Sequence, residues 1–209
     1  MEPTTYPTLN LDGYTPLPPG KLAAVVTFLE MTEPPALLPE PPGHDFTFAP
    51  VTDPQPDWYR DLFRRIGEEW LWYSRLRMDE AALRATLADP GVCVHVLRRA
   101  GETEDLGLIE LDFRTPGEVE LSYVGLVPGL VGGGAGRFMM NRALTLAFAT
   151  APRRVHVHTC TLDHQGAVGF YMRAGFRPYA RAIEVVDDPR LDGVLSRSAG
   201  RHAPLIESD

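Results

Sequence analysis

The stretch from Val119 to Met140 constrains the fold of this chain most. It reads VELSYVGLVPGLVGGGAGRFMM: an apolar-rich strand that runs into Pro128, a loop dense in glycine, and then a helix. Glycine lets the backbone approach an anion without a Cβ in the way, and the free N–H groups at a helix start carry the positive end of its dipole. This order of strand, loop and helix predicts a binding site for a phosphorylated ligand.

The spacing of the glycines excludes two familiar phosphate sites. A dinucleotide-binding fingerprint needs G-x-G-x-x-G, but counting from Gly132 places Arg137 at the third glycine, and counting from Gly134 places Met139 there. A P-loop needs G-x-x-x-x-G-K-[ST], and no Gly-Lys pair of the chain stands in that context.

The loop instead resembles the acyl-coenzyme A loop of the GCN5-related N-acetyltransferase (GNAT) superfamily, usually R/Q-x-x-G-x-G/A. Gly134 and Gly136 match its two small positions, and Val131 stands where Arg or Gln is usual. That loop grips pyrophosphate mainly through backbone N–H groups, which Val131 still supplies. The departure removes one polar side chain from the predicted site.

A second motif resembles the same superfamily. In TCTLDHQGAVGFYMRAGFRPY, the residues Ala167, Tyr171, Gly175 and Phe176 fall in register with N-x-x-A-x-x-x-Y-x-x-x-G-F, and His164 stands where Asn is usual. The two motifs follow one another in the expected order, with a helix and a strand between them. The resemblance covers roughly residues 92–186.

The pattern of strands and turns predicts the fold class. Short polar turns separate three apolar strands before the glycine loop, which implies antiparallel neighbours, and helices alternate with strands after it. We therefore expect an α/β (α+β) fold similar to that of GNAT proteins, with a mixed, mainly antiparallel central sheet flanked by helices on both faces. The expected strands are 21–31, 92–98, 106–113, 118–127, 153–159 and 176–186, with a short extended piece at 46–48. The expected helices are 57–66, 79–88, 134–150 and 163–174. Asp57, Asp79 and Asp163 are the expected N-caps of the first, second and fourth of these helices.

The same pattern divides the chain into three parts. Residues 1–20 read as an irregular N-terminal arm, residues 21–186 as a single GNAT-like acyltransferase domain, and residues 187–209 as a C-terminal tail that either packs or stays free. Prolines recur between 32 and 56, so we expect a packed loop there.

Composition bears on partners and location. The formal net charge of −8 argues against a nucleic-acid partner, whose phosphates require a basic face, and suits a cationic acceptor. Cys93 and Cys160 are unaccompanied, as expected for reduced thiols. The early apolar run 22–29 is too short to span a bilayer. We expect a cytoplasmic protein without a membrane partner.

An aromatic cluster follows the first helix. Trp70, Trp72 and Tyr73 lie within the segment EWLWYSRLR. One interpretation is that these rings anchor a loop to the core. The other is that one or two of them line the acceptor pocket, because the first helices cover that side in GNAT folds.

Tyr171 is the predicted acid. Aminolysis of a thioester requires a proton for the departing thiolate, and a phenol with a pKa near 10 is close to the thiol's own. The resemblance implies this role for Tyr171. The alternative is a tyrosine that fills the core between helix and sheet.

Glu120 is the predicted base. Glu118, Glu120 and Ser122 alternate along one face of the strand before the loop. Glu120 stands eleven residues before Val131, where histone-acetylating members of the superfamily carry their catalytic glutamate. We expect burial to raise its pKa towards neutrality. The alternative is a solvated carboxylate at the edge of the sheet.

The resemblance also implies the residues that bind coenzyme A. Its pantetheine arm would run between the strand that ends at Val127 and the strand that ends at Thr159. Arg137, Arg142 and Arg153 are further candidates for its phosphates. The expected binding residues are Leu126, Val127, Val131, Gly132, Gly133, Gly134, Ala135, Gly136, Arg137, His164 and Phe170.

A metal site is the less favoured interpretation of a second pattern. His156, His158 and Cys160 alternate along one strand. Residues four apart on a strand are about 13 Å from each other, too far to ligate one ion without a bend. We therefore expect no metal ion at this strand. Instead, we expect one of these histidines to lie near the acceptor, where it would act as an alternative base or form a polar part of the pocket wall.

The sequence thus predicts an acyl-CoA-dependent N-acetyltransferase with acetyl-CoA as co-substrate. The acceptor would be a small-molecule or peptide amine, and the resemblance admits a homodimer. Two alternatives stay open: a non-catalytic acyl-CoA-binding module used for sensing or assembly, and a nucleotide-binding protein whose glycines suggest the wrong ligand.

Overall fold

The computed structural model describes residues 8–207, so residues 1–7 of the predicted arm and 208–209 of the predicted tail lie outside it. The described chain forms one seven-stranded sheet in the order β2-β3-β4-β5-β6-β1-β7. The strands are β1 (Lys21–Met31), β2 (Phe46–Pro50), β3 (Val92–Arg99), β4 (Gly107–Asp112), β5 (Glu118–Leu126), β6 (Arg154–Cys160) and β7 (Arg177–Asp187).

The direction of each strand follows from the connection that precedes it. Hairpin turns join β3, β4 and β5, which pair antiparallel. The helix α4 (Ala135–Phe148) crosses over from β5 to β6, and these two strands pair parallel. The remaining neighbours pair antiparallel. The predicted mixed, mainly antiparallel sheet is confirmed.

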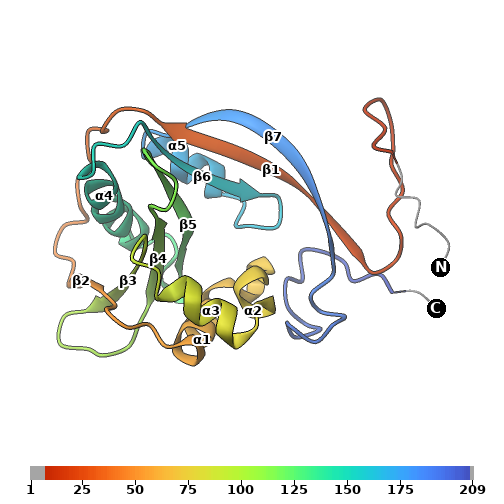
Figure 1. Cartoon of the computed structure of the whole chain (residues 1–209), viewed down its shortest axis with the longest axis horizontal. Coiled ribbons are helices and arrows are strands. Elements are labelled where there is room, and N and C mark those ends of the chain that lie inside the picture. Colours follow the sequence, from red (N-terminus) through yellow and green to blue (C-terminus); the bar gives the residue numbers. More distant parts are fainter. Residues whose placement is uncertain (1–7, 208–209) are drawn as a thin grey trace.

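Helices cover both faces of the sheet (Figure 1). On one face, α4 and α5 (Ala167–Arg173) pack on buried residues of β5 and β6 such as Leu121 and Val157. On the opposite face, α1 (Pro56–Gly67) and α3 (Glu80–Leu87) pack on β3 and β4. A 3₁₀ turn, η1 (Glu68–Trp70), and the short α2 (Ser74–Arg77) lie between α1 and α3, and η2 (Pro128–Leu130) precedes the glycine loop.

The N-terminal strand lies between two C-terminal strands. β1 pairs with β6 through Val26–Met31 and with β7 along most of its length. Figure 1 shows β1 and β7 as a long curved pair that extends past the other strands. Leu29 of β1 is completely buried in the core beneath α4 and α5, whereas Val25 on the same strand is 43% exposed.

Two predicted helix starts are wrong for local reasons. The N-cap of α1 is Gln55 rather than Asp57, because Pro56 lacks an N–H and suits the first helical position. Helix α5 begins at Ala167 rather than after Asp163, because the Asp163 carboxylate accepts hydrogen bonds from the end of β6 instead. The predicted cap Asp79 is confirmed by its bond from the Ala82 N–H.

The segments outside the helices and strands are fastened to the body. In the Pro-rich segment, the Leu38 carbonyl accepts a hydrogen bond from Asn141 of α4 at 2.8 Å, as expected for a packed loop. After β7, the buried Arg190 pairs with Asp188 and donates to the Ala203 carbonyl at 2.7 Å. The described part of the tail therefore packs. The division into arm, domain and tail itself stays a prediction.

Replacing Leu29 with Ala should lower the free energy of unfolding by about 2 to 5 kcal/mol, because it leaves a cavity in the core. Val25→Ala on the exposed part of the same strand should cost about 0.5 kcal/mol or less. Urea unfolding of both variants measures the difference. Equal, small losses would contradict the placement of β1 in the core.

Candidate active site

The site originates where β5 and β6 separate. The two strands pair at three positions only, the last being Glu120 with His156. Beyond that pair, β5 continues to Leu126 and β6 to Cys160 without pairing with each other. The backbone of β5 on this side has no strand partner among the described residues, so the sheet opens to a gap between β5 and β6.

A β-bulge changes which β5 side chains reach the gap. Glu110 of β4 pairs with Tyr123, but Leu111 pairs with Leu121, so Ser122 is the extra residue. The predicted alternation of Glu118, Glu120 and Ser122 therefore ends at the bulge. Tyr123 instead follows Glu120 on the face that carries α1 and α3.

A cavity of about 1030 Å³ occupies this gap. It is bounded by the glycine loop and α5 at one end and by the segment between α1 and α2 at the other. The strands β5, β6 and β7 supply Tyr123, His158 and Glu184 to its wall. One cavity thus reaches from the predicted phosphate loop to the predicted acceptor side.

The glycine loop has the backbone geometry of an anion site. Gly134 is the N-cap of α4 with a φ of 88°, in the left-handed region that favours glycine. A Cβ on Gly134 would lie 2.5 Å from Pro41 Cγ, so the Pro-rich segment closes over the loop only because this side chain is absent. Within the described residues no side chain caps α4. Its first N–H groups therefore have no side-chain acceptor, and Gly134 and Gly136 beside them line the cavity, which fits a phosphate.

Most predicted binding residues lie along the cavity. Arg142 and Arg153 are engaged elsewhere, in ion pairs with Glu40 at 3.0 Å and with Glu118 at 2.6 Å. Val127, Gly133 and Ala135 are not part of the wall. The predicted residues that line the cavity are Leu126, Val131, Gly132, Gly134, Gly136, Arg137, His164 and Phe170.

Tyr171 reaches the cavity from α5. Its side chain is only 7% exposed, and its ring packs edge-on against Phe170 and Phe176. Burial raises the pKa of the Tyr171 phenol well above its ordinary value of 10.0. The ordinary pKa near 10 that we expected for this phenol is therefore too low. The hydroxyl stays protonated at neutral pH, which is the state that an acid requires.

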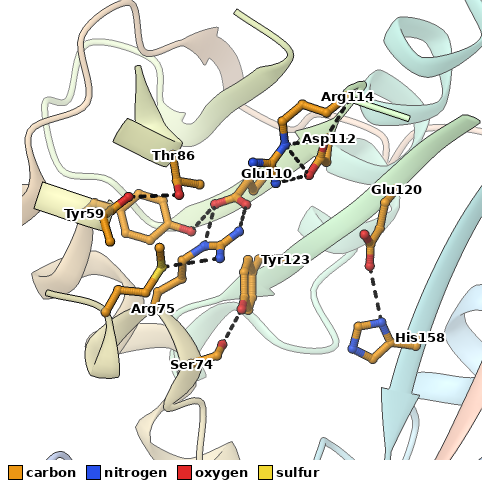
Figure 2. Close-up of polar contacts among 12 residues, drawn as sticks. Tyr59, Ser74, Arg75, Thr86, Glu110, Asp112, Arg114, Glu120, Tyr123 and His158 are labelled. Carbon is orange, nitrogen blue, oxygen red and sulfur yellow. Dashed lines mark hydrogen bonds and ion pairs between the residues drawn. The ribbon is translucent and has the colours of Figure 1, made fainter. Parts of the chain in front are cut away.

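Glu120 of β5 and His158 of β6 face each other where these two strands stop pairing. His158 Nδ1 lies 3.4 Å from Glu120 Oε1, and Figure 2 shows the carboxylate directed at the imidazole. This contact lowers the pKa of Glu120 and raises the pKa of His158. The expected rise in the pKa of Glu120 is therefore wrong, because the imidazole stabilises the carboxylate. His158 lines the large cavity, whereas Glu120 borders a separate hollow of about 370 Å³.

A buried ion pair supports the end of the cavity formed by the segment between α1 and α2. Glu110 of β4 is fully buried, pairs with Arg75 of α2, and accepts a hydrogen bond from Tyr59 at 2.5 Å. The Arg75 guanidinium lies 5.0 Å from the centre of the Tyr123 ring, whose hydroxyl meets Ser74 (Figure 2). This network holds the short α2 against the sheet. Sequence reasoning missed it, because Arg75 and Glu110 are far apart in the chain.

Asp163 fixes the aromatic segment over the end of β6. Its carboxylate accepts hydrogen bonds from Trp72 Nε1 at 3.1 Å, from Thr159 Oγ1 at 2.7 Å and from the Cys160 N–H at 2.8 Å. Trp72 also packs on Phe63 of the core. The anchoring interpretation of the aromatic cluster is therefore confirmed for Trp72, which also lines the cavity. That this part of the cavity receives the acceptor stays a prediction.

The histidines and the cysteine of β6 do not converge. His156 contacts Glu118 at 3.7 Å and His158 contacts Glu120. Across residues 8–207, no group of three or more His, Cys, Asp or Glu side chains is arranged to hold a metal ion. In the same part of the chain, no helix is both long and apolar enough to cross a membrane.

The match of a family model decides the identity of this fold. A model of the acetyltransferase (GNAT) family matches residues 53–176, more than half of the chain. The chain belongs to the GNAT family. The match takes in the glycine loop, Glu120 and Tyr171, whereas β1 and β7 lie outside it. No curated protein sequence matches the chain.

Solved structures share the GNAT fold at low sequence identity. A GCN5-related N-acetyltransferase from Sphaerobacter thermophilus has 15% identity and a TM-score of 0.59 over 91% of this chain and 55% of its own. An aminoglycoside acetyltransferase from an uncultured soil metagenomic sample has 12% identity and a TM-score of 0.51 over 63% of this chain and 88% of its own. Three of the matched proteins are longer, and the chain spans only 51 to 63% of their length.

Replacing Glu120 with Gln should lower the pKa of His158, because a neutral amide no longer stabilises the imidazolium. The pKa of His95, which burial lowers on β3, should not change. NMR titration of the imidazole resonances measures both. An unchanged pKa of His158 would refute the contact between the two side chains.

Proposed function

We propose that this GNAT protein transfers an acetyl group from acetyl-CoA to an amine by direct attack. One observation carries the proposal: a single cavity runs through the gap between β5 and β6 and meets Tyr171 from one face of the sheet and His158 from the other. A direct displacement needs an acid beside the leaving group and a base beside the nucleophile. The two sides of the gap supply these groups separately.

The donor end suits coenzyme A. The N–H groups at the start of α4 and the Arg137 side chain would hold its phosphates. The unpaired edge of β5 as far as Leu126 would hydrogen-bond the amides of the pantetheine arm. The thioester would then lie in the gap, beside Tyr171. Val131 and Gly132 line the same end of the cavity.

The reaction follows from the positions of the side chains. The amine nitrogen attacks the thioester carbonyl carbon, a C–N bond forms, and the C–S bond breaks. The Tyr171 hydroxyl donates its proton to the departing thiolate sulfur. We assign removal of the amine proton to the Glu120–His158 pair, in which His158 faces the cavity and Glu120 orients the imidazole and stabilises its charge.

The acceptor class is a small-molecule amine. The likeness to an aminoglycoside acetyltransferase, solved with sisomicin, supports a small amine rather than a nucleic acid or a membrane lipid. The net charge of −8 favours an acceptor that is cationic in solution. The peptide acceptor, the homodimer and the cytoplasmic location stay predictions.

Replacing Tyr171 with Phe should lower kcat by about 10² to 10³, because the thiolate then leaves without a proton donor. Tyr179→Phe, on the exposed part of β7, should keep wild-type turnover. Release of free thiol from acetyl-CoA across a panel of amines measures both. Undiminished turnover by the Tyr171 variant would remove the proposed acid.

Coenzyme A at about 100 times its Kd should raise the free energy of unfolding by about 2.7 kcal/mol, because it binds only the folded protein. ATP and NAD should not stabilise the folded protein against unfolding to this extent. Thermal unfolding with each ligand tests the donor. Protection by ATP or NAD alone would favour the nucleotide-binding alternative, and protection by coenzyme A without turnover of any amine would favour a non-catalytic acyl-CoA-binding module.

A further inference from the structure

The charges that line the cavity are separated along its length. The cationic side chains, Arg137 and Arg173, lie at the end formed by α4 and α5. The carboxylates, Asp163 and Glu184, lie towards the end formed by the aromatic segment and β7. A cavity with this distribution attracts phosphates at one end and a positively charged group at the other.

Most carboxylates near the acceptor end are already compensated. Asp163 accepts three hydrogen bonds from the protein, including one from the Cys160 N–H. Glu120 contacts His158, and Glu110 pairs with Arg75 beneath the cavity wall. These groups have structural partners, so a ligand would have to displace one of them in order to bind there.

Glu184 differs from these carboxylates. It is an exposed residue of β7 that lines the cavity, and its hydrogen bond comes from the Tyr73 hydroxyl at 3.0 Å. Among residues 8–207, no Lys, Arg or His side chain lies within salt-bridge distance of it, although many other carboxylates of the chain have such a partner. A neutral phenol leaves the negative charge of Glu184 available to a cation.

The surroundings of Glu184 favour an organic cation. The aromatic rings of Trp72, Tyr73 and Tyr123 line the same end of the cavity. Aromatic faces attract alkylammonium groups. Arg77 lies over the outer face of the Tyr73 ring at 4.6 Å, but its own charge is paired with Asp192.

The backbones of Glu184 and His158 are separated within the sheet, so the two side chains suit different nitrogen atoms of one ligand, while the Glu184 charge still contributes to the raised pKa of His158. β1 lies between β6 and β7, so two strand spacings separate His158 from Glu184, about 10 Å across the sheet. The register adds a displacement along the strands, because Phe28 of β1 is opposite His158, whereas Ala24 is opposite Glu184. The two side chains face the same cavity from different places.

We propose that the acceptor is a small aliphatic diamine, with one amine at the Glu120–His158 pair and the second, as an ammonium, bound by Glu184. This proposal rests on the proposed acetyl transfer. The distal ammonium replaces the Tyr73 hydroxyl as the partner of the Glu184 carboxylate. Glu184 is then a specificity-determining residue that contacts the substrate away from the reacting atoms.

The test compares diamines with monoamines of equal chain length, for example cadaverine with pentylamine and putrescine with butylamine. Wild type should have the higher kcat/KM for each diamine. Glu184→Gln should lower kcat/KM for cadaverine by about tenfold, mainly through KM, and leave pentylamine unchanged. Asp187→Asn, which removes a carboxylate of β7 that pairs with Lys21 outside the cavity, should leave the diamine preference intact.

A second variant separates the charge of Glu184 from its structural contact. Tyr73→Phe breaks the same hydrogen bond but keeps the carboxylate, so it should retain the preference for cadaverine. If Tyr73→Phe copies the loss seen in Glu184→Gln, the bond between the two residues matters rather than the charge, and the proposal is overturned. Equal use of cadaverine and pentylamine by wild type would overturn it as well, while acetyl transfer itself would stand.

Binding measurements distinguish the proposed diamine site from the proposed acetyl transfer. Calorimetric titration of cadaverine and pentylamine into the protein with coenzyme A needs no turnover. Tighter binding of cadaverine that Glu184→Gln abolishes would support the diamine site even if no amine were acetylated, in which case the proposed reaction alone would fail. Equal affinities for the two amines would overturn the diamine site.

Discussion

The short parallel pairing between β5 and β6 is the constraint on which the site depends. It holds the strands together for three residue pairs and then stops, so the sheet keeps its core yet opens beyond Glu120. Antiparallel pairing of β5 with β4 and of β6 with β1 holds the outer edges of the gap. Strand pairing therefore flanks the opening on both sides, and a ligand that reaches through it meets side chains from both faces.

Polar contacts keep the two faces in position around this gap. Asp163 ties Trp72 to the end of β6, and the buried Glu110 ties Arg75, and with it α2, to β4. The buried charge of Glu110 is costly unless it is paired, so its contact with Arg75 fixes α2 against the sheet. The other end of the cavity is built differently, from glycine backbone and the start of α4, which needs no side chain to attract an anion.

Residues outside the family match also line the cavity. Residues 53–176 contain the glycine loop and Tyr171, whereas Glu184 comes from β7, which pairs with β1 at the edge of the sheet. The family-matched region and the flanking strands thus contribute different ends of one cavity.

The sequence by itself predicted the family and the sheet class, which are confirmed, and a phosphate-binding loop, which stays a prediction, because the spacing of Gly134, Gly136 and Tyr171 is local and depends on little beyond the neighbouring backbone. Only the tertiary structure decided which side chains line the other end of the cavity. The bulge at Ser122 turns Tyr123 towards the site, and the insertion of β1 between β6 and β7 brings Glu184 to the cavity. The direction of the pKa shift of Glu120 depends on His158, which lies on another strand. Such features depend on pairing between segments far apart in the chain, and no local pattern of residues encodes that pairing.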